Sequence, residues 1–323
     1  YSFFAYIYIM ILVTGATGML GAHFLLSLSS QKKKIRAFYR TEEKRIEVIA
    51  FFKYHNKEKN LSYIEWLKGS YDQIDLLDQA LEEVDTVIHC AALISFDPKR
   101  KSQLYKTNVE GTRNLVNALI AKKINLIFIS SIAAANEGAS SYYGYTKYLS
   151  ELEVYRGVQE GIKATIVRPG VILSDYFWNR PSGSIFKQLA QQKTRVTKGS
   201  VGLTTANTVV RCTLHLSKNE QKTPTILVTK IMRYDELAKA MGAEKIQFIG
   251  KPILRGLSVI EAFYAFIFRK PRKLSSEIVD SLTSESIYPT LSDYPELGEV
   301  ELENFEAELK QLSQSYRATC AGA

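Results

Sequence analysis

The sequence has few of the residues that build metal centres and disulfide frameworks. Its 323 residues include three cysteines and four histidines. Cys90, Cys212 and Cys320 are scattered and form no Cys-x-x-Cys pair, which argues against disulfides and against a structural zinc site. The histidines are scattered as well. We therefore expect no metal cofactor and a reducing, cytoplasmic compartment.

Long hydrophobic runs and nucleic-acid recognition motifs are also lacking. Residues 1–13 are apolar, but a membrane span needs about 20 residues, and the basic flank of a signal peptide is missing. The net charge is +9, yet the basic residues are dispersed apart from Lys32–Lys34 and Lys99–Lys101. We expect neither nucleic acid nor membrane as a partner. Residues 1–9 are expected to be an extension or expression remnant, because Met10 looks like a natural start.

What the chain does contain is an alternation of short apolar runs and amphipathic helical patterns up to about residue 168. Helical spacing is clearest over Gln103–Ala121. This alternation predicts a parallel sheet with helices on both faces. Right-handed crossovers make such a sheet doubly wound, with ligands at the carboxyl ends of its strands. The expected strands are Met10–Thr14, Ile35–Tyr39, Leu61–Leu67, Thr86–Cys90, Leu126–Ser130 and Ala164–Arg168.

The alternation stops after Pro169. We expect a Rossmann-like dinucleotide-binding domain over 10–169 and a smaller, mostly helical substrate lobe over 170–323, with some return to the sheet around 204–230. The aromatic stretch Ala262–Phe268 is assigned to the core or to a hydrophobic lid, because it is short for a membrane anchor. Helical patterns in the lobe cover Thr208–Leu216, Tyr234–Met241, Gly256–Phe268 and Leu302–Leu312.

A glycine-rich turn, Thr14–Gly21, follows the first expected strand and opens an apolar helical stretch. In a dinucleotide site Gly15 would form the turn, Gly18 would let the backbone approach the pyrophosphate, and Gly21 would let the helix pack close to the sheet. Glycine turns are common. The evidence for a dinucleotide site is that an expected strand precedes this turn and a helical stretch follows it.

A tyrosine and a lysine one helical turn apart give the second signal. Tyr143 and Lys147 lie on one face of a predicted helix. A neighbouring ammonium is expected to bring the phenol pKa down from about 10, and the lysine can bind a nucleotide ribose. Tyr142 and Tyr145 are rivals without a lysine at this spacing. Ser131, after the fifth strand, is expected to orient a substrate oxygen; alternatively, it only caps a loop.

Together these features resemble the extended short-chain dehydrogenase/reductase superfamily, which includes NAD-dependent epimerases and dehydratases. Thr14–Gly21 is similar to its TGxxGxxG turn, Val87–Ala92 to its fourth-strand motif, and Asn108–Leu115 to its NVxGTxNL helix. Trp178-Asn179-Arg180 and the lobe look closest to the dihydroflavonol-4-reductase-like branch. The resemblance implies a Rossmann-like fold, and homodimers are frequent in the superfamily, so a homodimer stays open. The implied catalytic residues are Ser131, Tyr143 and Lys147, supported by Asn108.

The resemblance also implies where a cofactor binds. The aspartate that the superfamily usually has after its third strand is absent here, and Ser70 follows Gly69. Adenine recognition is therefore expected from Ser70, Tyr71 or the backbone. The implied cofactor-binding residues are Gly15, Thr17, Gly18, Met19, Leu20, Ser70, Tyr71, Cys90, Ala91, Ala92, Ser130, Tyr143, Lys147, Pro169 and Val171.

The end of the second strand favours NADP(H) over NAD(H). An acidic residue at this point binds the ribose diol of NAD, whereas arginine accommodates the additional phosphate of NADP. Here Arg40 ends the strand, with no acid before Glu42, and Lys44 adds a second cation. NAD(H) stays an alternative, because Arg40 could simply begin a solvated helix face.

We therefore expect a reductase or dehydrogenase that acts on the carbonyl or alcohol of a small, hydrophobic or aromatic substrate. The nicotinamide would exchange hydride and Tyr143 a proton. Phe96 and Trp178 are expected to line the substrate pocket. A sugar-nucleotide epimerase is the enzymatic alternative. An NADP-sensing regulatory protein without turnover is the alternative outside enzymes.

Overall fold

The main sheet has seven strands, all parallel. The structure is a computed structural model that describes residues 10–70, 73–134, 141–219, 223–267 and 274–321. The strand order is β10-β6-β5-β4-β1-β2-β3. This confirms the predicted doubly wound, Rossmann-like α/β fold. The strands are β1 (Met10–Thr14), β2 (Lys34–Tyr39), β3 (Ile64–Lys68), β4 (Val84–His89), β5 (Asn125–Ile129), β6 (Ala164–Pro169) and β10 (Thr225–Leu227).

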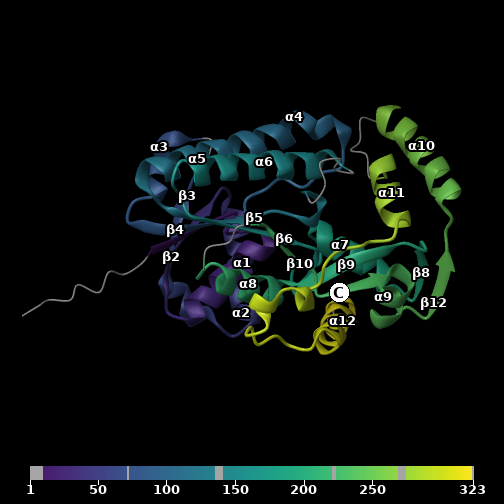
Figure 1. Cartoon of the computed structure of the whole chain (residues 1–323). Coiled ribbons are helices and arrows are strands. Elements are labelled where there is room, and N and C mark those ends of the chain that lie inside the picture. The colour runs from purple at the N-terminus through teal and green to yellow at the C-terminus, as the bar shows by residue number, and fades with distance from the viewer. Residues whose placement is uncertain (1–9, 71–72, 135–140, 220–222, 268–273, 322–323) are drawn as a thin grey trace, which may run out of the picture.

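Consecutive residues of the central strands pack into two separate cores. Leu12 and Phe128 belong to one core, whereas their chain neighbours Val13 and Ile127 belong to the other. Both faces of the sheet are covered, so these strands read as continuous apolar runs. Figure 1 shows α1, α2 and α8 on one face and α3, α5 and α6 on the other. Their bounds are α1 (Met19–Ser30), α2 (Glu42–Tyr54), α3 (Ile74–Ala80), α5 (Gly111–Lys122), α6 (Tyr142–Gln159) and α8 (Ala206–Leu216).

The predicted helix Gln103–Ala121 is continuous but contains a wider turn. It begins as α4 (Lys101–Leu104), continues as a π-helical turn η3 (Tyr105–Glu110) and ends as α5. Such a turn inserts a residue into the helical ladder and is often found at functional sites. Short 3₁₀ helices occur at η1 (Glu58–Tyr63), η2 (Pro98–Arg100), η4 (Ile132–Ala134), η5 (Leu291–Asp293) and η6 (Pro295–Leu297).

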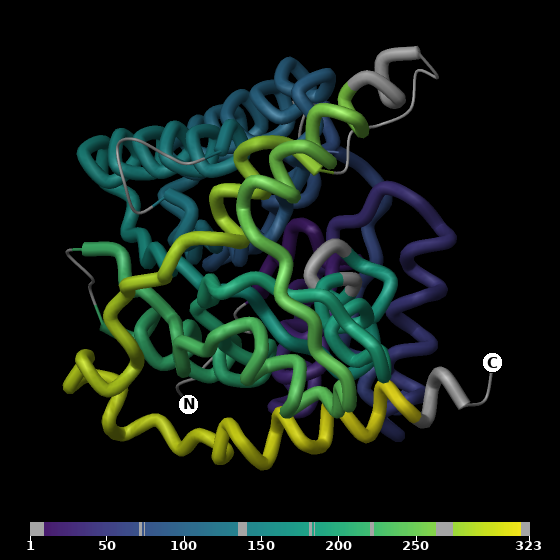
Figure 2. The backbone as a smooth tube through the Cα atoms, turned by 90° about the vertical axis from the view of Figure 1, so that its right-hand side faces the viewer, coloured from purple at the N-terminus to yellow at the C-terminus, as the bar shows by residue number. Residues whose placement is uncertain are grey.

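The C-terminal region packs around a third core and contains two small sheets. One sheet joins β7, β9 and β11, and the other pairs β8 with β12 in parallel. Figure 2 faces the side of the molecule that α10 crosses, with α12 below it. The elements are β7 (Val171–Leu173), α7 (Pro181–Leu189), β8 (Lys193–Val196), β9 (Ser200–Thr205), β11 (Lys230–Arg233), α9 (Tyr234–Ala240), β12 (Lys245–Phe248), α10 (Lys251–Ile267), α11 (Ser276–Thr283) and α12 (Phe305–Ala321).

Two local expectations were wrong. The third strand begins at Ile64 rather than Leu61, because Leu61 belongs to η1 and packs against the core beneath α1. Residues 170–203, in which no strand was expected, contain β7, β8 and β9. These three strands are short, so their alternation is too brief to be read from the sequence.

In the described part of the chain no helix is both long and apolar enough to cross a membrane.

Candidate active site

The glycine turn leaves no room for side chains. Gly15 has a φ of +64°, and a Cβ built on it would lie 2.6 Å from the amide nitrogen of Ala91. A Cβ on Gly21 would lie 2.2 Å from the carbonyl oxygen of Gly15. Gly18 precedes the first residue of α1 without a side-chain cap, so the first amide groups of the helix are available to an anion. This cradle has the features that a dinucleotide pyrophosphate requires.

A buried histidine holds the strands beside the cradle in register. His89 Nδ1 shares a hydrogen bond of 2.6 Å with the hydroxyl of Thr14, and Nε2 lies 3.4 Å from that of Thr112. Burial lowers the pKa of His89 to about 3, so the ring is neutral and structural. Cys90 follows it, and burial raises the pKa of its thiol. Ala91 lies directly against Gly15.

The predicted tyrosine and lysine lie in α6 and are both buried. Lys147 Nζ donates a hydrogen bond of 2.7 Å to the carbonyl oxygen of Ile129, the last residue of β5, and lies 4.2 Å from the ring centroid of Phe128. Burial lowers the pKa of Lys147 to about 8, although Glu151 and Cys90 oppose this shift. The ammonium therefore sits at the carboxyl edge of the sheet.

The expected direction of the Tyr143 pKa shift was wrong. Burial raises the pKa of Tyr143 to about 12, and a hydrogen bond with Ser131 only partly offsets this. The ammonium of Lys147 is directed to the backbone of Ile129, so burial of the phenol dominates. Burial therefore disfavours the phenolate of Tyr143 in the structure without cofactor. The hydroxyl of Ser131 also accepts from the amide of Ala133 at 3.2 Å, so it caps the loop after β5 as well as bonding to Tyr143.

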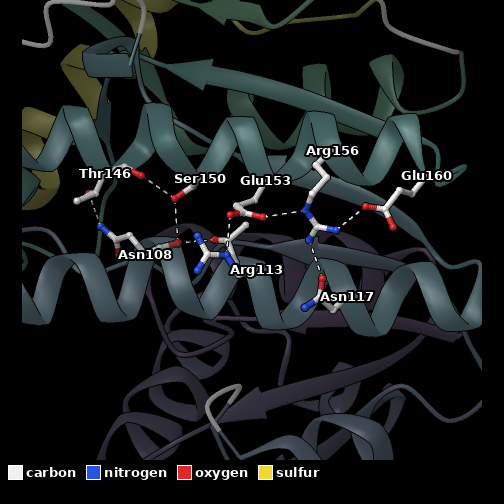
Figure 3. A network of polar contacts seen from close by, with 9 residues as sticks. Asn108, Arg113, Asn117, Thr146, Ser150, Glu153, Arg156 and Glu160 are labelled. Carbon is white, nitrogen blue, oxygen red and sulfur yellow. Dashed lines mark hydrogen bonds and ion pairs between the residues drawn. The ribbon is translucent and has the colours of Figure 1, made fainter.

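Asn108 holds the part of α6 that carries Tyr143 and Lys147 through side-chain hydrogen bonds. Its side-chain amide donates to the carbonyl of Leu93 and to the hydroxyl of Thr146, both at 3.0 Å, and its oxygen accepts from the amide of Leu93 at 2.8 Å. Ser150 donates to the backbone carbonyls of Asn108 and Thr146. Figure 3 shows these residues linking η3 and α6. Asn108 is therefore a positioning residue that fixes α6 between Tyr143 and Lys147.

A buried polar group without a partner lies at the same edge of the sheet as the cradle. Ser130 follows β5, its amide donates to the carbonyl of Val167 at 2.8 Å, and its buried hydroxyl has no partner among the described residues. A buried hydroxyl without a partner is costly unless a ligand satisfies it. The open cradle and this hydroxyl together fit a nicotinamide dinucleotide. Among the described residues no group of three or more histidine, cysteine or acidic side chains is placed to hold a metal ion.

Basic side chains gather at the outer end of the cradle. Arg40 is exposed at the end of β2, and the pKa of Lys44 is lowered by burial and by the nearby Arg180 and Arg40. Arg180 comes from the lobe: its Nη2 donates to the carbonyl of Thr17 at 3.2 Å and to Glu47 at 2.5 Å. We had not assigned Arg180 a role, and only its place beside Trp178 singled it out in the sequence. Ser70 is partly buried after β3, and Tyr71 lies outside the described residues.

The two expected substrate residues have different surroundings. Phe96 is 38% exposed, and its ring centroid lies 6.1 Å from that of Tyr143 in an edge-to-face contact. Trp178 is only 5% exposed and packs against Tyr316 in the core of the lobe. In this structure Trp178 therefore stabilises the lobe. Pro169 pairs with Leu227 at the end of β6.

The profile of the family described as "NAD dependent epimerase/dehydratase family" matches residues 11–217. The chain belongs to this family. The matched range covers the cradle, Ser131, Tyr143 and Lys147, and members of the family use nicotinamide cofactors.

Three relatives show how far the similarity extends. "Sterol demethylase protein B" of Methylococcus capsulatus is 28% identical over 192 residues, 53% of each chain. A "Putative dihydroflavonol 4-reductase" of Synechocystis is 28% identical over 203 residues, 56% of this chain and 54% of that one. The chain spans about half the length of these curated relatives. The structure of WbmG from Bordetella bronchiseptica in complex with NAD has a TM-score of 0.72 at 15% identity, covering 96% of this chain and 94% of that chain, which shows the same fold.

Lys147→Met should change how stability depends on pH. The folded-state pKa of Lys147, about 8, is below its unfolded value of about 10.4. Between these values the unfolded chain binds more protons, so stability rises with pH in the wild type. From about pH 8 to 10, we expect the free energy of unfolding of the wild type to rise relative to that of the variant by about 1 kcal/mol per pH unit. Urea unfolding measures both. Lys163→Met, which removes an exposed ammonium, is the control. A difference in unfolding free energy between the wild type and Lys147→Met that stays constant with pH would contradict this account.

Proposed function

We propose that the protein is an NADP(H)-dependent oxidoreductase that reduces a carbonyl, or oxidises the corresponding alcohol, of a small hydrophobic or aromatic molecule. The observation that carries this proposal is the protonated, buried phenol of Tyr143 beside Ser131 and Lys147, at the edge of the sheet that also holds the glycine cradle. Membership of an NAD-dependent family supports nicotinamide chemistry.

Each residue has a separate role in the proposed reduction. Bound nicotinamide supplies the hydride that the carbonyl carbon receives. Ser131 donates a hydrogen bond to the carbonyl oxygen and orients it toward Tyr143. The Oη of Tyr143 donates the proton that this oxygen gains as the C–O double bond becomes single. The buried ammonium of Lys147, which donates to the carbonyl of Ile129 at the same sheet edge, would hold the ribose hydroxyls of the cofactor.

The proposed preference for NADP(H) depends on charge at the outer end of the cradle. Arg40, Lys44 and Arg180 come from β2, α2 and the lobe, and they influence one another electrostatically. Glu47 neutralises part of this charge through Arg180. The remaining cations favour a cofactor with an additional phosphate.

An apolar substrate is proposed from the residues that flank Tyr143. Ile94 and Phe96 lie in the loop after β4, and both are exposed. Aromatic and aliphatic side chains in that position favour an apolar substrate over a sugar nucleotide. The name of the Methylococcus relative, which refers to a sterol, agrees with this substrate class.

A sugar-nucleotide epimerase is the second candidate, because the family includes such enzymes. An epimerase retains its cofactor through the cycle, whereas the proposed reductase exchanges it in each turnover. Purification with stoichiometric NAD(H) that survives gel filtration would favour the epimerase.

Tyr143→Phe should remove turnover while leaving cofactor binding intact. The variant lacks only the transferable proton, and such a group contributes about 10²- to 10⁴-fold to rate. We expect kcat to fall at least about 100-fold across a panel of aromatic ketones and aldehydes, followed by NADPH absorbance, with NADPH affinity nearly unchanged. Tyr145→Phe, at an exposed tyrosine two residues further along α6, should keep full activity. Full activity in Tyr143→Phe would refute the assignment.

Arg40→Ala should weaken the binding of NADPH and leave the binding of NADH nearly unchanged. Loss of one charge-assisted contact to phosphate costs about 1.5–3 kcal/mol, so we expect the Kd of NADPH to rise about tenfold or more and that of NADH to change less than about twofold. Titration of nicotinamide fluorescence measures both. Lys53→Ala, an exposed cation at the far end of α2, is the control. Equal wild-type affinities for the two cofactors would contradict the proposed preference.

A further inference from the structure

The outward face of α10 is apolar and uncovered. Ile253, Leu257, Val259 and Ile260 are 46–69% exposed, while Leu254 and Ser258 of the same helix are buried. Ile253, Leu257 and Ile260 are spaced so that they lie on one side of the helix. Single exposed aliphatic residues are common, but several on one helix mark a surface that binds something.

The helix lies at an edge of the molecule. It continues from β12, and Figures 1 and 2 show it on the outside of the lobe with α11 as its inner neighbour. Arg255 and Lys251 pair with Asp280 of α11, at 3.4 and 2.7 Å. These ion pairs hold the inner side of α10 to the protein and leave the apolar side outward.

Exposed basic residues lie on β12, the strand that leads into α10, and on its partner β8. β8 and β12 pair in parallel with Lys193 opposite Lys245, and both are exposed, as is Arg195 two residues further along β8. Phe248, at the end of β12, is 52% exposed. The acids on these elements are Glu261 of α10, which accepts from the amide of Leu274, Glu277 and the paired Asp280 of α11, and Glu244 before β12.

We propose that the outward face of α10, together with the cations of β8 and β12, binds the surface of a bilayer that contains anionic lipid. An interfacial helix lies in the plane of the membrane, with its aliphatic side chains between the headgroups and the acyl chains. Lysine and arginine beside it meet lipid phosphates. A second copy of the chain fits less well, because a two-fold contact would bring the same basic residues close together.

This inference goes beyond the proposed function and does not depend on it. It replaces the expectation that the chain contacts no membrane, which was based on the length of apolar runs. Length decides whether a helix spans a bilayer, whereas an interfacial helix needs only one apolar face. The sequence assigned Ala262–Phe268 to the core or a lid, and Phe268 lies outside the described residues.

Vesicle sedimentation of the full chain tests the proposal. We expect the protein to sediment with phosphatidylcholine vesicles that contain about one third phosphatidylglycerol, and at least about tenfold less with phosphatidylcholine alone. The triple variant Ile253→Ser, Leu257→Ser, Ile260→Ser should bind the anionic vesicles at least about tenfold less. Ile287→Ser, which changes an 89% exposed residue outside α10, should bind like the wild type. Thermal unfolding confirms that each variant is folded.

Three outcomes would overturn the proposal. The first is a wild-type protein that stays in the supernatant with anionic vesicles. The second is a folded triple variant that sediments as well as the wild type. The third is a wild-type dimer in light scattering that the triple variant converts to a monomer without any vesicle binding, which would assign the face to a second copy.

Discussion

The hydrogen bond from the buried ammonium of Lys147 to the carbonyl of Ile129 is the contact on which the site depends. It fastens α6 to the carboxyl end of β5, and because Tyr143 is one turn earlier on the same helix, it also fixes the phenol at the sheet edge. Asn108 secures the same segment through Thr146. Burial of a cation is unfavourable in the folded state, as the lowered pKa of Lys147 shows. Such a group lowers the stability of the folded protein, and groups with strongly shifted pKa values are concentrated at functional sites.

Much of the fold and the core of the site could be predicted because their determinants are local. Val13 and its neighbours form a continuous apolar strand, the glycines of Thr14–Gly21 follow it directly, and the cradle needs no distant residue to acquire its shape. The spacing of Tyr143 and Lys147 places both side chains on one face of a helix without tertiary information. The alternation of apolar runs and helical patterns predicts a parallel sheet, and right-handed crossovers make it doubly wound.

The remaining features depend on tertiary contacts that the sequence does not encode locally. Arg180 reaches Thr17 across 163 residues of chain, and no periodic pattern links such positions. The pKa of Tyr143 depends on how deeply the ring is buried and on where the ammonium of Lys147 points, and the spacing of the two residues gives neither. Trp178 occupies the lobe core because neighbouring elements close over it. The exposure of the aliphatic residues of α10 depends on which elements pack against that helix.

The crystal structure of the protein with NADP⁺ is the measurement that tests the account most directly. The account predicts that Lys147 Nζ lies about 3 Å from a hydroxyl of the nicotinamide ribose, that the Tyr143 hydroxyl faces the reactive side of the ring, and that the pyrophosphate rests on the first amides of α1. A cofactor bound elsewhere, or bound in the cradle with both side chains directed away from the nicotinamide, would contradict it.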